Sequence, residues 1–191
     1  MRHELHRDGP AFRLRPVVDE DAAYIVDLRA RGGPYINRGA TNVAAQRDWL
    51  TRYYEREGDF YFVVVSRRDA RREGLVGIYD VRDGGAEWGR FVLEPGSVAA
   101  VETALLVYDV AFDELALDRV CCRTLAANTH VVAFHDSCGL VRTPGEVTIT
   151  HDGAPARAIE HWMTRNAWRQ TRERMDRLAA RIAATLSRSP R

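Results

Sequence analysis

The chain has 191 residues, a formal net charge of +1 at neutral pH, and 46% hydrophobic residues. This size and composition predict a single domain, 1–191, with one packed core. The near-zero net charge gives no global field that would steer the chain to nucleic acid. No apolar run approaches the roughly 18 residues that a membrane-spanning helix needs. The first eight residues lack the apolar stretch of a signal peptide, so we expect a cytoplasmic protein without a membrane partner.

The three cysteines also argue against a metal site or a disulfide framework. Cys121 and Cys122 are adjacent on a predicted strand, so their side chains should point to opposite faces and cannot easily share a metal. With Cys138 the count is odd, which favours buried thiols in a reducing compartment. We therefore expect no metal cofactor.

The first half of the chain alternates between strand and helix patterns. In chain order, the patterns predict a strand at 12–16, a helix capped by Asp19, a glycine-rich loop at 31–39, a helix from Thr41 or Asn42 to Tyr54, and strands at 59–66, 75–81 and 86–93. A charged hairpin at 67–74 and the Asp83-Gly-Gly85 turn join the last three strands.

The second half begins with a long helical run. The predicted elements are a helix at 99–115, a strand at 117–125, a short helix from Asn128 or Thr129 to Cys138 that ends at Gly139, strands at 141–150 and 157–164, and a helix at 166–186. Strands followed by interleaved helices and strands predict an α+β sheet with helices on both faces.

Several stretches together resemble the GNAT N-acetyltransferase superfamily. The segment Leu125-Ala-Ala-Asn-Thr-His-Val-Val-Ala-Phe-His-Asp-Ser-Cys-Gly-Leu140 resembles the second half of its acyl-CoA fold, where a strand and a helix diverge at an Asn. Three further stretches resemble the branch that contains ribosomal-protein N-terminal acetylases and amino-sugar acetylases: Ala86-Glu-Trp-Gly-Arg-Phe-Val-Leu93, Glu102 to Phe112, and Glu160-His-Trp-Met-Thr164 followed by Trp168. The resemblance covers roughly residues 11 to 168.

The resemblance implies a GNAT-like mixed, largely antiparallel central sheet that is splayed between the fourth and fifth strands, with an extra C-terminal helix at 166–186. It also implies acetyl-CoA as the co-substrate. The implied cofactor contacts are Phe91, Val92, Leu93, Gly96, Ser97, Val98, Ala99, Ala100, Asn128 and Phe134.

The loop that would hold the pyrophosphate departs from the family pattern. The family usually has Gln or Arg, then two glycines or Gly and Ala, at the N-terminus of the following helix. Here Pro95 replaces Gln or Arg, Val98 replaces the first Gly, and only Ala100 fits. A β-branched Val resists positive φ, so this loop could bind the phosphates more weakly.

Two residues carry the chemistry that the resemblance implies. Glu87 is the candidate base that deprotonates the amine, through a water, and the alternative is a surface carboxylate. His135, after Phe134, occupies the position of a Tyr acid in many relatives and should titrate near neutrality. Its alternative role is to cap the short helix.

The acceptor is expected between the irregular N-terminal loop and the fourth strand. Tyr35, Asn37, Arg38 and Tyr79 are the candidate substrate-binding residues. The resulting hypothesis is an acetyl-CoA-dependent N-acetyltransferase that acts by direct attack of a primary amine on the thioester, with an amino sugar or nucleotide-linked amino sugar as acceptor. The alternatives are a protein or peptide N-terminal acetyltransferase and a non-catalytic acyl-CoA-binding module.

The C-terminal helix at 166–186 combines an apolar stripe with many arginines. The stripe is Trp168, Thr171, Met175, Leu178, Ile182 and Leu186. It predicts packing on the domain or on a second subunit in a homodimer. Acidic residues dilute the positive charge, so nucleic acid is not the expected partner.

Overall fold

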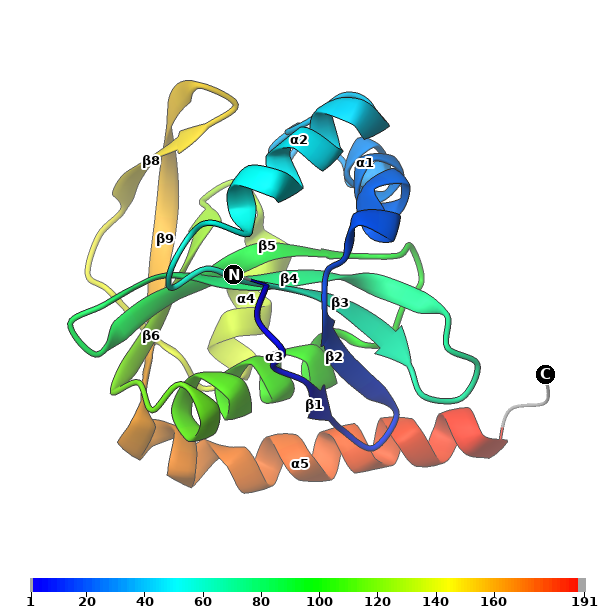
Figure 1. The fold of residues 1–191 in the computed structure, drawn as a ribbon. Coiled ribbons are helices and arrows are strands. Elements are labelled where there is room, and N and C mark those ends of the chain that lie inside the picture. Colours follow the sequence, from blue (N-terminus) through cyan, green and yellow to red (C-terminus); the bar gives the residue numbers. More distant parts are fainter. Residues whose placement is uncertain (1, 189–191) are drawn as a thin grey trace.

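The computed structural model describes residues 2–188, which form one mixed sheet between two layers of helices (Figure 1). Along the sheet the strands follow the order β1-β2-β3-β4-β5-β6-β9-β7, and β8 also pairs with β9. The strands are β1 (Arg7–Asp8), β2 (Phe12–Pro16), β3 (Phe60–Ser66), β4 (Arg72–Arg82), β5 (Gly85–Leu93), β6 (Arg119–Leu125), β7 (Val141–Arg142), β8 (Val147–His151) and β9 (Ala154–Thr164).

The sheet opens at one place, between β5 and β6. These two strands form the one parallel pair among the described residues, and they pair only from Gly85 with Arg119 to Glu87 with Cys121. Beyond that point β5 continues to Leu93 and β6 to Leu125 without pairing with each other. Each stays paired with its other neighbour, β5 with β4 and β6 with β9. The expected splay between the fourth and fifth predicted strands is therefore confirmed.

Helices cover both faces of the sheet. Figure 1 shows α1 and α2 on one side, and α3 and α5 on the other. Their bounds are α1 (Ala22–Arg31), after a short 3-10 turn at Asp19–Asp21; α2 (Val43–Tyr53); α3 (Ala100–Asp109), continued by a π-helical turn at Val110–Glu114; α4 (Thr129–Ser137); and α5 (Arg165–Arg188). No helix within residues 2–188 is both long enough and apolar enough to cross a bilayer.

Strand alternation divides the core into two clusters. On β3, Phe62 and Val64 face the cluster that α3 and α5 complete, whereas Tyr61 and Val63 face the cluster under α1 and α2. The alternation follows from the period of two along a strand. It places Cys122 in the first cluster, and all three cysteines are buried free thiols, as expected.

Two helix starts can be compared with the expectations. Asn42 caps α2 through a 2.9 Å hydrogen bond from the Ala45 N–H. The prediction that Asp19 caps the first helix is wrong, because its carboxylate instead accepts a hydrogen bond from the Tyr54 hydroxyl. The buried Asp21 carboxylate accepts a 3.0 Å bond from the Val18 N–H at the start of the 3-10 turn, and α1 itself has no side-chain cap.

The predicted strand at 141–150 is in fact two strands. Thr143 to Glu146 separate β7 from β8, and both strands pair with β9. Pro144 has no N–H for a ladder, and Gly145 has φ of +80°, so the chain turns here. The prediction missed this break because apolar residues on both sides continue the alternating pattern.

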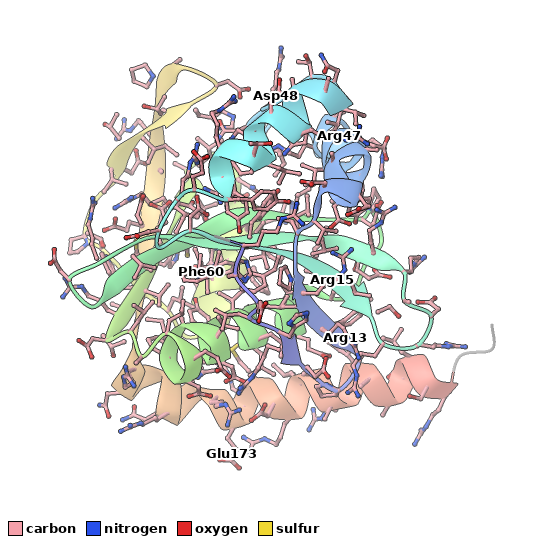
Figure 2. The ribbon with its side chains drawn as sticks, in the orientation of Figure 1. Arg13, Arg15, Arg47, Asp48, Phe60 and Glu173 are labelled. Atoms are coloured by element: carbon pink, nitrogen blue, oxygen red, sulfur yellow. The ribbon has the colours of Figure 1, made fainter. Side chains whose placement is uncertain are left out.

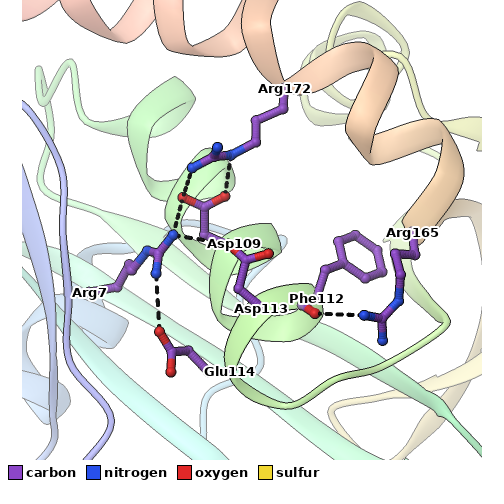
Figure 3. Close-up of polar contacts among 7 residues, drawn as sticks. All are labelled: Arg7, Asp109, Phe112, Asp113, Glu114, Arg165 and Arg172. Atoms are coloured by element: carbon purple, nitrogen blue, oxygen red, sulfur yellow. Dashed lines mark hydrogen bonds and ion pairs between the residues drawn. The ribbon is translucent and has the colours of Figure 1, made fainter.

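Helix α5 packs on the domain through part of its predicted stripe. Trp168 and Met175 of the stripe are buried and Leu178 is 39% exposed, while Ala179, which is not part of the predicted stripe, is also buried. An ion-pair cluster fixes the same helix to α3 (Figure 3): the carboxylate of Asp109 accepts hydrogen bonds of 2.8 and 3.0 Å from Arg172 and of 3.0 Å from Arg7. Asp109 is almost fully buried, so this is an interior clamp and not a surface charge pair.

Candidate active site

A cleft of about 1250 Å³ begins where β5 and β6 separate. Its walls come from β5, β6, α4, β8 and the segment between α1 and α2. Beyond Glu87, no described strand pairs with the β6 side of β5, so backbone N–H groups on that edge face the cleft. Such groups are fixed dipoles that can stabilise a developing negative charge.

Glu87 lies at the point where the two strands separate. Its carboxylate accepts a 3.1 Å hydrogen bond from the Tyr79 hydroxyl and a 2.5 Å bond from Arg123. Burial raises the pKa of the Glu87 carboxyl above its ordinary value, while the Arg123 cation and the Tyr79 hydrogen bond act in the opposite direction. A raised pKa makes a carboxylate a stronger base near neutral pH.

Arg123 connects two carboxylates of the cleft. Besides Glu87, it binds Glu160 on β9 with an Nε–Oε2 distance of 2.8 Å. Glu160 is held in turn by the Trp162 indole N–H at 2.8 Å and by the Thr143 hydroxyl at 2.9 Å. The sequence reasoning missed Arg123. A charged residue inside the otherwise apolar run of β6 was the one signal for it.

A β-bulge bends β5 next to Glu87. Leu75 pairs with Val92 and Gly77 with Gly89, so β5 has one extra residue between these pairs. Arg90 lies in this interval with φ of +50°, an uncommon conformation for a non-glycine residue. The bulge turns the end of β5 away from β6, as bulges beside functional sites often do.

Two glycines that pair across β4 and β5 leave room for side chains on the cleft floor. A Cβ at Gly89 would lie 2.5 Å from the Tyr79 hydroxyl, and a Cβ at Gly77 would lie 3.3 Å from Arg90 Cδ. Arg90 therefore lies flat, 4.5 Å from the Tyr79 ring centre, and forms a bidentate pair with buried Asp59 at 2.5 and 2.8 Å. A side chain at Gly89 would displace the Tyr79 hydroxyl, and one at Gly77 would press on the Arg90 side chain.

His135 lines the cleft but is itself buried. Its ring packs edge-on to Trp88 at 5.2 Å and lies 5.4 Å from the His161 ring. Burial lowers the pKa of His135 to about 4, and the neighbouring His161 adds to this effect. The expectation that His135 titrates near neutrality is therefore wrong: at neutral pH it is an uncharged imidazole. Its Nδ1 has no hydrogen-bond partner among residues 2–188.

The loop before α3, where the resemblance predicts the pyrophosphate site, is not distorted by Val98. Gly96 takes the positive φ of +80°, whereas Val98 does not, so the conformational objection to Val98 does not hold. The Val98 side chain points outward and is 48% exposed. Helix α3 starts at Ala100 with no side-chain cap, which leaves its first N–H groups available to an anion. Asn128 precedes α4, and its side chain makes no cap either.

At one end of the cleft, where the acceptor is expected, contacts join segments that are far apart in sequence. Asn37 Oδ1 accepts a 2.9 Å bond from the Asp152 N–H, and Asp152 accepts a 2.8 Å bond from the Arg38 N–H. The His151 ring nitrogen lies 3.3 Å from the Pro34 carbonyl oxygen. These contacts join the α1–α2 loop to the β8–β9 turn.

Most of the predicted site residues line this one cleft. Those in its wall are Tyr35, Asn37, Tyr79, Glu87, Phe91, Val92, Leu93, Ala100, Asn128, Phe134 and His135. Those outside its wall are Arg38, Gly96, Ser97, Val98 and Ala99. The wall also contains charged and aromatic residues that the sequence reasoning did not single out, namely Arg29, Arg56, Arg90, Arg123, Trp49 and Tyr61.

Comparisons with known proteins agree with this geometry. Residues 12–141 match the family model described as an acetyltransferase (GNAT) domain. Among solved structures, FdhC, described as a nucleotide-linked sugar GNAT, superposes with a TM-score of 0.79 at 23% identity, covering 92% of this chain and 98% of that one. No curated protein matches significantly.

Two further solved structures share the fold. A GCN5-related N-acetyltransferase from Brucella melitensis has a TM-score of 0.77 at 16% identity, covering 93% of this chain and 86% of that one. The spermidine/spermine N-acetyltransferase SpeG from Vibrio cholerae has a TM-score of 0.71 at 16% identity, covering 83% of this chain and 96% of that one. At these identities the likeness shows the fold alone.

Proposed function

This chain belongs to the GNAT acetyltransferase family, and from that premise we propose that it transfers the acetyl group of acetyl-CoA to the primary amine of a small molecule, an amino sugar or a nucleotide-linked amino sugar. The observation that carries the proposal is the position of Glu87. It is the carboxylate at the opening between β5 and β6, with a pKa raised by burial, at the point from which both strand edges face the cleft.

Each part of the cleft has a role in this reaction. When bound, acetyl-CoA supplies a thioester whose carbonyl carbon accepts the amine. The Gly96 to Ala100 loop and the start of α3 would hold its pyrophosphate, and Asn128 and Phe134 would contact its pantetheine arm. Glu87 removes the proton from the ammonium, directly or through a water. Backbone N–H groups in the Phe91 to Leu93 stretch would bind the pantetheine arm and polarise the thioester carbonyl.

His135 acts as an uncharged group in this proposal. Since its pKa is about 4, it carries no positive charge at neutral pH. It would donate a hydrogen bond from a ring N–H to the sulfur of the leaving CoA thiolate. The corresponding thiol has a pKa near the ~8.5 of a cysteine. The imidazole stabilises the departing charge without transferring its own proton.

The contacts between the α1–α2 loop and the β8–β9 turn, at the acceptor end of the cleft, favour a small-molecule acceptor over a protein N-terminus. The hydrogen bonds that Asp152 makes with Asn37 and Arg38 join two loops across this end. A peptide would need an open groove there, and these contacts would have to break to admit it.

The direct test is a panel of acceptors with acetyl-CoA: amino sugars, nucleotide-linked amino sugars, polyamines and short peptides. Thiol release gives the rate, and mass spectrometry identifies the acetylated product. We expect one acetyl group on the amine of an amino sugar. Faster acetylation of a peptide N-terminus would favour the protein N-acetyltransferase alternative. Calorimetric binding of acetyl-CoA without turnover of any amine would favour the non-catalytic module.

A further inference from the structure

We propose that Arg29 binds an anionic group of the acceptor, so that the enzyme selects amines that also carry a phosphate or a carboxylate and discriminates against polyamines. The proposal rests on the proposed function and names the substrate class of the same cleft. It concerns the acceptor end, where the α1–α2 loop lies over the sheet.

The charged side chains of the cleft are mostly cationic. Its wall contains five arginines but two glutamates, Glu87 and Glu160. Both glutamates are already bound by Arg123. Apart from Glu87, which receives the reacting amine, the wall therefore has no carboxylate left to bind the further ammonium groups of a polyamine.

Two of the other arginines share one carboxylate. Arg90 forms the bidentate pair with Asp59, and Arg56 lies 3.7 Å from the same carboxylate. Arg31 binds Glu94 and Asp27 on the outside of the cleft. The positive charges of Arg56 and Arg90 are thus only half compensated by Asp59.

Arg29 differs from these arginines because it has neutral partners alone. It projects from the last turn of α1 and is half-buried. Its guanidinium donates to the Asn37 carbonyl oxygen and is near enough to the Tyr61 hydroxyl to act against the rise of that group's pKa, and within residues 2–188 the structure records no carboxylate partner for it.

The surroundings of Arg29 fix its guanidinium in place. Gly39, with φ of +64°, brings the loop backbone so close that a Cβ there would lie 3.1 Å from Arg29 Nε. Tyr61 is buried beneath it. A guanidinium has five N–H donors, and a half-buried one gains most from an anion with two oxygens. Its free donors make this a preformed anion site at the acceptor end.

The charge balance also works against a cationic acceptor. Arg29, Arg56 and Arg90 face the cleft against the single carboxylate of Asp59. In a partly desolvated cleft, like charges repel more strongly than in water. A polyamine would bring further positive charges into this region, whereas a phosphate or carboxylate would neutralise it.

The experiment compares wild type with Arg29→Gln on four amines: glucosamine, glucosamine 6-phosphate, an amino-sugar uronate and spermidine. Arg47→Gln is the matched control, because Arg47 is an exposed arginine on α2 outside the cleft (Figure 2). Steady-state kcat/KM is measured for each amine, and calorimetry measures binding of each amine and of acetyl-CoA. The phosphate and uronate arms distinguish the two anionic sources.

For wild type, we expect the anionic amines to have a kcat/KM at least about 10-fold above that of glucosamine, with spermidine the poorest. Arg29→Gln should lower kcat/KM for the preferred anionic amine by about 10- to 100-fold, mainly through KM, because one charge-assisted contact is lost. Glucosamine should change less than about 3-fold, acetyl-CoA affinity should be unchanged, and Arg47→Gln should match wild type.

Several results would overturn the proposal. These are a preference for spermidine, equal losses for neutral and anionic amines in Arg29→Gln, weaker acetyl-CoA binding in that variant, or no binding of any anionic amine. If no amine is acetylated, the proposed function fails, but calorimetric binding of the anionic amines still tests Arg29. Circular dichroism of each variant verifies that it is folded.

Discussion

Glu87 is held between a hydroxyl donor and a cation, and this arrangement determines when it can act as a base. Its side chain is 14% exposed, and burial raises the pKa of its carboxyl. Arg123 opposes that effect and at the same time fixes the direction of the carboxylate. Arg123 is therefore a positioning residue, since it acts on the reaction through Glu87.

Replacing Arg123 by Gln should shift the pH dependence of kcat/KM. Glu87 must be ionised to accept a proton, so the acid limb of the profile follows its pKa. Without the Arg123 cation, that pKa rises, and the limb should move to higher pH by about 0.5 to 1 unit. The measurement is kcat/KM from pH 5 to 9.

Arg119→Gln is the control, because Arg119 lies on the same strand and is exposed outside the cleft. It should leave the acid limb unchanged. An Arg123→Gln profile that is uniformly lower, with its acid limb at the wild-type pH, would mean that Arg123 has only a structural role.

For single residues, the sequence predicted which side chains line the cleft better than it predicted their protonation. Glu87 and His135 line the cleft as expected, but the low pKa of His135 depends on Trp88 and His161, which are distant in sequence. The same limit explains why Arg29 was missed. Its environment depends on Tyr61 and Gly39, and no local pattern reports those contacts.

Among the elements, β5 forms the edge of the cleft and α5 completes the core beneath α3. The bulge and the short pairing of β5 with β6 open the cleft. Helix α5 closes the opposite side of the core through Trp168 and through the Asp109 clamp with Arg172 and Arg7 (Figure 3). The clamp joins β1, α3 and α5 through charged hydrogen bonds, in addition to the apolar contacts of the core.

Asp109→Ala should destabilise the fold by about 1 to 3 kcal/mol, because two partly buried guanidiniums lose their shared carboxylate. Glu173→Ala is the matched control. Glu173 projects to solvent from α5, the helix of Arg172 (Figure 2), is 82% exposed and pairs with Arg177, so its loss should cost less than about 0.5 kcal/mol. The measurement is the free energy of unfolding in urea. Equal values for both variants would contradict an interior clamp.

Periodicity predicted the order and type of nearly all the main elements because strands and helices here have clear apolar faces. The exceptions have local causes that periodicity does not report. Pro144 and Gly145 divide one predicted strand, and the last turn of the predicted 99–115 helix is π-helical from Val110 to Glu114.

For the whole molecule, the site is an assembly of segments from across the chain. The Asn37 loop meets the Asp152 turn across 115 residues of sequence. A family resemblance could predict the splayed sheet, since that feature belongs to the shared fold. It could not predict the contacts between the two loops at the acceptor end or the surplus of arginines there, because those depend on residues particular to this chain.

The central claim is that Glu87 deprotonates an amine in the cleft between β5 and β6. Asp83→Asn is the control for a test of this claim: Asp83 is an exposed carboxylate in the turn before β5, outside the cleft wall, and its φ of +49° suits Asn. It should retain wild-type turnover.

The most direct test is the turnover of Glu87→Gln relative to wild type from pH 6.5 to 9.5, with the best acceptor and saturating acetyl-CoA. At pH 7 most of the amine is protonated, so loss of the base should lower the rate by about 10²- to 10⁴-fold. The deficit should shrink as pH approaches the pKa of the amine, roughly 8 to 10, because free amine becomes abundant. A folded Glu87→Gln enzyme with wild-type turnover across this range would contradict the account.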